Sequence, residues 1–209
     1  MINIARHFAH PHGLLGRFVG LGMARGNAAF SRWVVDELPA PANADPRIVE
    51  IGPGPGVGLE AVLQRFPQAS VWGVDMSREM ISQSRGRNRP AADAGRLTLI
   101  LGGVDRLAGI APIDVMFANH VLYFWHDPKT DLKGIRSSLR PGGVLGVGYQ
   151  LKQNMPPMAQ KFFPRDGHLL YDSIDQVEDL LHTSGFASVT HRVMGPPDTP
   201  TGRLALAIA

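Results

Sequence analysis

The chain has 209 residues, of which 44% are hydrophobic, and it carries no cysteine and a formal net charge of +3. This length suits one α/β domain with a sizeable core and leaves no room in this chain for a second catalytic domain. Without cysteine there is no disulfide framework, thiol nucleophile or cysteine-ligated zinc site. No run approaches the ~18 apolar residues of a membrane span, so we expect a cytoplasmic protein without one.

Apolar residues from Leu14 to Leu38 recur with helical spacing and predict one or two amphipathic helices ahead of the first strand. Pro39 and Pro41 follow and end this helical segment. We therefore separate residues 1–46, an N-terminal helical cap, from the rest of the chain.

A strand and a glycine-rich turn come next. Ile48 to Ile51 has the apolar, β-branched character of a buried parallel strand, and the glycines from Gly52 to Gly56 alternate with prolines. Such glycines let the backbone turn sharply and approach a ligand that side chains would exclude. About twenty residues on, Asp75 closes a second apolar run, where a carboxylate can accept hydrogen bonds from both hydroxyls of a ribose. The two segments predict a pocket for a nucleotide-type cofactor.

The glycine spacing disfavours a dinucleotide. A G-x-G-x-x-G register that begins at Gly52 places Val57 at the third glycine position. A shifted register, Gly56 to Ala61, begins several residues past the strand and would misplace a pyrophosphate relative to the helix N-terminus. A nicotinamide-dependent oxidoreductase therefore remains only an alternative.

The pattern Glu50-x-Gly52-x-Gly54-x-Gly56 resembles motif I of the class I S-adenosylmethionine (SAM) methyltransferases. Further stretches extend the resemblance over most of the chain. They are Gly73 to Ser77, similar to motif II; Asp114 to Trp125, similar to the fourth strand and its active-site turn; Leu139 to Leu145, similar to the turn before the fifth strand; and 184–209, similar to a helix end and two closing strands.

The resemblance implies a doubly wound α/β fold: a seven-stranded sheet, mostly parallel with an antiparallel last strand, helices on both faces and an N-terminal helical cap. Residues 47–209 are then a SAM-binding, Rossmann-like catalytic domain. In this family such a cap tends to lie over the cofactor and complete the substrate cavity. The alternative is that the cap packs on the sheet and does nothing else.

The resemblance also implies a set of cofactor-binding residues. They are Glu50, Gly52, Pro53, Gly54, Gly56, Asp75, Met76, Gly103, Val104, Asp105, Asn119 and His120. One position departs from the family, because Gly103 stands where an acidic residue often contacts the adenine amino group. The adenine is then read by the Val104 backbone or by Asp105, two positions further on.

Methyl transfer from a sulfonium requires alignment and dehydration, and it needs a general base only for some acceptors. His120 is the first candidate for a base, because it follows a central strand at the edge where ligands bind in α/β sheets. Tyr123 is the second candidate, and both can instead be structural. His7, His10 and His12 lack the spacing of common zinc motifs, so no metal site is expected.

The sequence thus predicts a SAM-dependent methyltransferase that methylates an O, N or C atom of a small molecule and releases S-adenosylhomocysteine (SAH). Neither a nucleic-acid partner nor a membrane span is expected, and the oligomeric state is left open. The basic stretch from Arg78 to Arg89 is interpreted as a solvated helix end. A SAM-binding protein that catalyses a rearrangement or cyclisation is the alternative with the same fold.

Overall fold

The computed structural model describes residues 27–157, 160 and 169–209. Its first helix covers residues 27–37. The elements that follow are β1 (Arg47–Ile51), α3 (Val57–Arg65), β2 (Ser70–Asp75), α4 (Arg78–Arg87), α5 (Arg89–Asp93), β3 (Leu97–Leu101), η1 (Val104–Gly109), β4 (Ile113–Asn119), η2 (Leu122–Phe124), α6 (Pro128–Ser138), β5 (Leu139–Tyr149), η3 (Lys152–Asn154), α8 (Ile174–Thr183), β6 (Ser188–Met194) and β7 (Gly202–Ile208). None of the helices among these described residues is long and apolar enough to cross a membrane.

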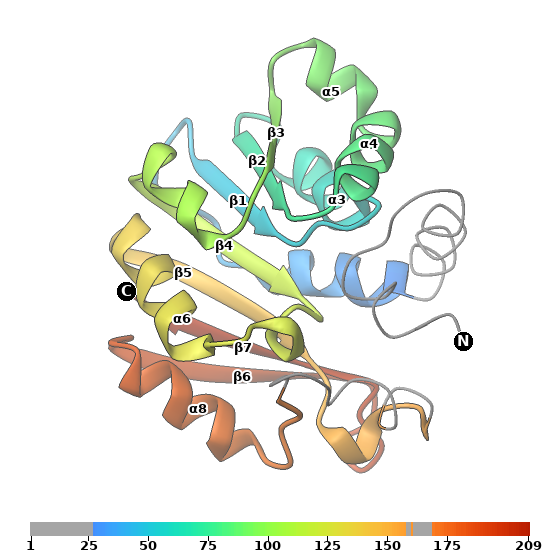
Figure 1. The fold of residues 1–209 in the computed structure, drawn as a ribbon, viewed down its shortest axis with the longest axis vertical. Coiled ribbons are helices and arrows are strands. Elements are labelled where there is room, and N and C mark those ends of the chain that lie inside the picture. Colours follow the sequence, from blue (N-terminus) through green and yellow to red (C-terminus); the bar gives the residue numbers. More distant parts are fainter. Residues whose placement is uncertain (1–26, 158–159, 161–168) are drawn as a thin grey trace.

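The strands form one seven-stranded sheet in the order β3-β2-β1-β4-β5-β7-β6 (Figure 1). The neighbours from β3 to β5 pair in parallel, whereas β7 pairs antiparallel with both β5 and β6. This confirms the predicted doubly wound α/β sheet with an antiparallel last strand. The order reverses between β1 and β4, and ligands bind beyond the carboxyl ends of the strands at such a switch point.

Helices cover both faces of the sheet and enclose two apolar clusters (Figure 1). The helix over residues 27–37 and α3 pack on one face, with Val35 and Leu59 completely buried there. On the other face α6 and α8 pack, with Leu132 and Leu181 buried beneath them. The central strand β4 is buried along its length except at its end, because it has helices on both sides.

The described part of the predicted cap packs directly on the sheet. Phe30, Val34, Val35 and Leu38 lie on one side of the helix over residues 27–37 and are all buried. The earlier residues, with His7, His10 and His12, lie outside the described residues, as does His168. The packing of the described part is therefore established, while a role over the cofactor stays a prediction.

Helix starts follow the expected capping chemistry. Ser77 caps α4 by accepting a hydrogen bond from the Met80 amide at 3.3 Å, and Ser173 caps α8 in the same way. Asp127 caps α6, with Pro128 at the first helical position. These caps fix where each helix leaves the sheet.

The start of β5 differs from the sequence expectation. The stretch Leu139 to Leu145 predicted a turn before the strand, but β5 already begins at Leu139. Its pairing with β4 shifts between Ile113 and Val115, so the proline and glycines lie in an irregular first part of the strand. Proline and glycine are tolerated in strands at such irregularities, because the regular ladder of hydrogen bonds is interrupted there.

Asp114, buried near the start of β4, joins three segments. Its carboxylate accepts hydrogen bonds from the Arg47 amide at 2.8 Å, from the Arg140 guanidinium at 2.8 Å and from the Asn43 side chain. It therefore holds β1, β4 and β5 together at the edge opposite their carboxyl ends. A buried carboxylate is stable here because its oxygens are hydrogen-bonded.

We expect Asp114→Ala to lower the free energy of unfolding by about 2–4 kcal/mol, because it leaves donors without their carboxylate. Urea unfolding of the purified protein measures this. Asp93→Ala is the matched control, since Asp93 pairs with Arg85 and Arg89 on the surface and should contribute less than about 1 kcal/mol. An equal effect of the two changes would contradict a special role for Asp114.

Candidate active site

The glycine-rich loop lies between β1 and α3. Gly52, Gly54 and Gly56 have φ of 65°, 52° and 82°, a left-handed backbone that favours glycine. A Cβ on Gly52 would lie 2.6 Å from a methyl group of Val121, whereas a Cβ on Gly54 would meet nothing within 4 Å. The loop is therefore closely packed at its start and open at Gly54, as a loop that admits a ligand to its backbone should be.

Asp75 ends β2 and faces this loop. One carboxylate oxygen accepts a hydrogen bond from the Gly54 amide at 3.1 Å, and the other accepts from the Ser77 amide at 2.8 Å. Burial raises the pKa of Asp75 to about 6, although the two amides oppose the shift. The next residue, Met76, is largely exposed at 66%. Asp75 thus fixes the loop and remains the carboxylate at the edge of the pocket.

Glu50, in β1, is a second carboxylate behind the loop. Its side chain is buried against Gly58, where a Cβ would lie 2.2 Å from Oε1. Burial first, and then the charge of Asp75, raise the pKa of Glu50 to about 8, while the Leu59 backbone and then the Asn119 side chain oppose the shift. The Asn119 side chain is thus close enough to Glu50 to affect its pKa, but among the described residues Glu50 Oε2 and both side-chain amide atoms of Asn119 are buried without a hydrogen bond of normal geometry.

Such atoms need partners, because a buried polar group without one costs about 1–3 kcal/mol. They lie at the ends of two adjacent strands, β1 and β4, on either side of the switch point. An open glycine backbone, a carboxylate at the edge and unsatisfied polar atoms together fit a polar, nucleotide-type cofactor.

The segment after β3 holds the predicted adenine contacts. The Gly103 amide donates to Asp105 Oδ1 at 3.1 Å, and the other oxygen of Asp105 pairs with Arg106 at 3.2 Å. The Val104 side chain is partly buried against the glycine of α6 at position 134. The Asp105 carboxylate thus already interacts with its own turn, and the choice between it and the Val104 backbone stays a prediction.

His120 follows β4 directly. It has φ of 55°, which is unusual for a residue other than glycine, and its amide donates to the Gly148 carbonyl at 2.8 Å. Its imidazole stacks on Phe30, with ring centroids 4.4 Å apart. Burial lowers the pKa of His120 to about 4, so the ring is neutral at pH 7.

Tyr123, the second candidate base, is fully buried in η2. Its hydroxyl donates to the Gln150 carbonyl at 3.1 Å and accepts from the Gln150 amide. Burial raises its pKa well above the ordinary value. Trp125 is also in the core, while His126 is exposed.

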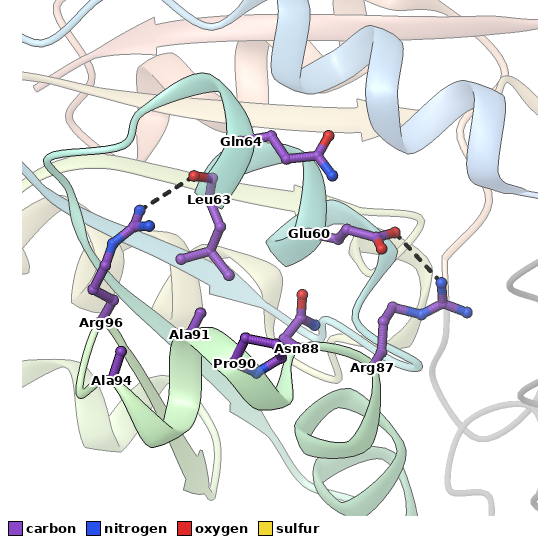
Figure 2. Close-up of a pocket in the computed structure, with 9 residues that line it drawn as sticks. All are labelled: Glu60, Leu63, Gln64, Arg87, Asn88, Pro90, Ala91, Ala94 and Arg96. Carbon is purple, nitrogen blue, oxygen red and sulfur yellow. Dashed lines mark hydrogen bonds and ion pairs between the residues drawn. The ribbon is translucent and has the colours of Figure 1, made fainter.

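A surface pocket of about 340 Å³ lies behind the glycine loop, between α3 and α5 (Figure 2). Arg87 donates to the Pro55 carbonyl at 2.9 Å, and Asn88 donates to the Gly56 carbonyl at 3.0 Å. The pocket residues thus support the loop from outside. Arg87 also pairs with Glu60, which agrees with a solvated helix end.

Sequence reasoning placed Phe30 in a helix and did not connect it with the site. It also did not anticipate the loop contacts of Arg87 and Asn88. The sequence signal for a role of Phe30 at the site was weak. It consists only of two glycines far along the chain, at positions 148 and 202, against which the ring lies. No group of three potential metal ligands occurs within residues 27–157, 160 and 169–209.

Fold and loop define an α/β protein with a nucleotide-type cofactor site. A family described as a methyltransferase domain matches residues 24–191. The chain belongs to this family, and its fold is that of the class I SAM-dependent methyltransferases. This membership argues against the nicotinamide-dependent alternative.

Individual relatives agree with this assignment. Trans-aconitate 2-methyltransferase of Azoarcus sp. (strain BH72) is 35% identical over 100 residues, which are 48% of this chain and 37% of that protein. The same enzyme of Rhodopseudomonas palustris (strain BisB5) is 36% identical over 115 residues, 55% of this chain and 42% of the relative. The chain therefore matches less than half the length of these relatives.

Among solved structures, mitomycin 7-O-methyltransferase MmcR has a TM-score of 0.73 at 20% identity. The match covers 98% of this chain and 60% of MmcR. At this identity the likeness shows a shared fold alone.

Replacing Asp75 by Ala should weaken SAH binding tenfold or more, because a carboxylate that also orders the loop is lost. Calorimetric titration with SAH measures this. Asp93→Ala is the control, since Asp93 pairs with Arg85 and Arg89 on the surface and was assigned no role toward the cofactor. Unchanged affinity in Asp75→Ala would show that the cofactor is bound in another way.

Glu50 predicts how stability depends on pH. Its pKa is about 8 in the folded protein, against 4.5 for the ordinary group. The folded state therefore holds a proton that the unfolded state releases, so stability should fall by roughly 3 kcal/mol from about pH 5 to pH 8. Glu50→Gln should flatten this decline and leave the smaller contribution of Asp75, which has the same sign. Urea unfolding across this pH range tests it, and parallel curves for both proteins would refute the assignment to Glu50.

Proposed function

We propose that this protein transfers the methyl group of SAM to a small molecule whose attacking atom is already ionised at neutral pH, a carboxylate. The observation that carries the proposal is the state of His120, the first candidate for a general base, which directly follows β4. Its pKa of about 4 makes it neutral and too weak a base to activate a hydroxyl efficiently.

The residues that would hold SAM are those that fit a nucleotide-type ligand. The backbone from Gly52 to Gly56 would admit the amino-acid end, and Asp75 would accept from the ribose. Glu50 and Asn119 have buried atoms without partners toward the polar end of the same ligand. When bound, SAM supplies a methyl group on a sulfonium, which is transferred by in-line displacement.

The residues of the chain then have to bind, orient and exclude water. Among the described residues, Tyr123 is not a suitable base either, because its hydroxyl is held by the Gln150 backbone and its pKa is raised. A carboxylate needs no deprotonation at pH 7, since its ordinary pKa is about 4. His120 can accept one hydrogen bond or donate one from its neutral ring, and so orient the acceptor.

The relatives support the same acceptor class. Their names give trans-aconitate, a carboxylate, as the compound they methylate. Because the chain matches less than half of the length of each relative, we infer only the class of acceptor, a carboxylate, and not the individual acid.

The experiment is an SAH-release assay with a panel of acceptors. It contains trans-aconitate and other small carboxylic acids, together with phenols, primary amines and thiols of similar size. We expect SAH release with one or more carboxylates, and a product 14 mass units heavier that alkali hydrolyses back to the acid, as a methyl ester requires. NAD serves as the comparison ligand in the binding titration with SAH.

The pH profile gives a second result. Between about pH 6 and pH 8 neither a carboxylate acceptor nor His120 titrates. Any change of turnover in this range should therefore follow Asp75 and Glu50, whose pKa values are about 6 and about 8, and should parallel the pH dependence of SAH affinity. Methylation of phenols or amines alone would refute the carboxylate proposal while leaving methyl transfer intact. Binding of SAH without release from SAM by any acceptor would instead favour the non-methylating alternative.

A further inference from the structure

Phe30 reaches from the N-terminal helix to the residue that the proposed function places beside the acceptor. Its side chain is 6% exposed. Its ring lies 4.4 Å from the His120 imidazole, centroid to centroid, with 29° between the ring planes. His120 also stacks with Tyr123, at 6.3 Å and 26°. The imidazole is therefore part of an aromatic stack that joins the helix to η2.

Two glycines make room for the Phe30 ring. A Cβ on Gly202, at the start of β7, would lie 2.2 Å from the ring, and a Cβ on Gly148, in β5, would lie 3.0 Å from it. Neither glycine has a left-handed backbone. The reason for glycine at these positions is therefore space for the ring and not backbone conformation.

The backbone of His120 is held in a costly conformation. A non-glycine residue in the left-handed region is strained, and such strain persists only where the surroundings fix it. Here the His120 amide is bound to the Gly148 carbonyl, on the same strand residue that accommodates Phe30. The strand thus holds the backbone of His120 while Phe30 covers its ring.

We propose that Phe30 is a positioning residue for His120: its ring, seated on Gly148 and Gly202, excludes water from the imidazole and keeps it in one orientation. The proposal rests on the proposed function in assigning His120 to the acceptor site. The contacts that Phe30 makes with His120 and the two glycines do not depend on which acceptor is methylated.

Electrostatics support this role. Burial is the cause of the lowered pKa of His120, and no charged group among the described residues contributes to the shift. The titratable group stacked on the ring is Tyr123, whose hydroxyl is turned to the Gln150 backbone. Removing the apolar cover should therefore raise the pKa of His120 toward its ordinary value of 6.5.

The test is an NMR titration of the His120 ring in the full-length protein without cofactor. His120→Gln assigns the resonance. Phe30→Leu removes the stack but keeps an apolar side chain, and Phe30→Ala removes both. Gly202→Ala leaves Phe30 and His120 unchanged in sequence and displaces the ring by its added Cβ. Gly148→Ala is avoided, because its Cβ would also meet the Asn119 side chain at 2.5 Å.

Leu38→Ala is the matched control. Leu38 is buried directly after the same helix and lies against Gly146, in the middle of β5. It should destabilise the protein without moving the His120 midpoint. Thermal unfolding of every variant establishes that it is folded, and if Phe30→Ala does not fold, Phe30→Leu and Gly202→Ala decide the outcome.

We expect the midpoint near pH 4 to rise by one pH unit or more in Phe30→Leu and Gly202→Ala. An unchanged midpoint in both variants overturns the proposal, as does an equal rise in Leu38→Ala. Failure of the proposed function is distinct, because it would leave the midpoint dependent on Phe30 while no carboxylate is methylated.

Discussion

The carboxylate of Asp75 is the interaction on which the cofactor end of this protein depends. It accepts hydrogen bonds from the Gly54 and Ser77 amides, and so it joins the glycine loop to the start of α4. Without it, a loop of left-handed glycines would lose its anchor to β2. Arg87 and Asn88 hold the carbonyl groups of the same loop from the opposite side. The Gly54 amide of the loop is thus held by Asp75, whereas the Pro55 and Gly56 carbonyls are held by Arg87 and Asn88.

Burial sets the chemistry of the site more than direct ion pairing does. Glu50, Asp75 and His120 all have pKa values shifted toward the neutral form, and burial is the largest cause for each. At pH 7 Glu50 and His120 are therefore mostly neutral, whereas Asp75, with a pKa of about 6, is mostly ionised. Neutral side chains allow water to be excluded without burying further charge.

The N-terminal helix is part of this arrangement. It packs on the sheet through its apolar side, and Phe30 extends from that side to His120. Of the two alternatives for the cap, packing on the sheet is observed for residues 27–37, and a wall of the cavity stays a prediction. The contact of Phe30 with His120 shows how one helix can do both.

The sequence by itself determined the fold class, the glycine loop and the position of Asp75, because these follow from local patterns: an apolar strand, alternating glycines and a carboxylate at the next strand end. Only the tertiary structure showed that the Tyr123 hydroxyl is held by a distant backbone and that Phe30 lies on His120. These contacts join residues 27 and 90 positions apart, and burial, which sets the pKa of each site group, exists only once the sheet is assembled.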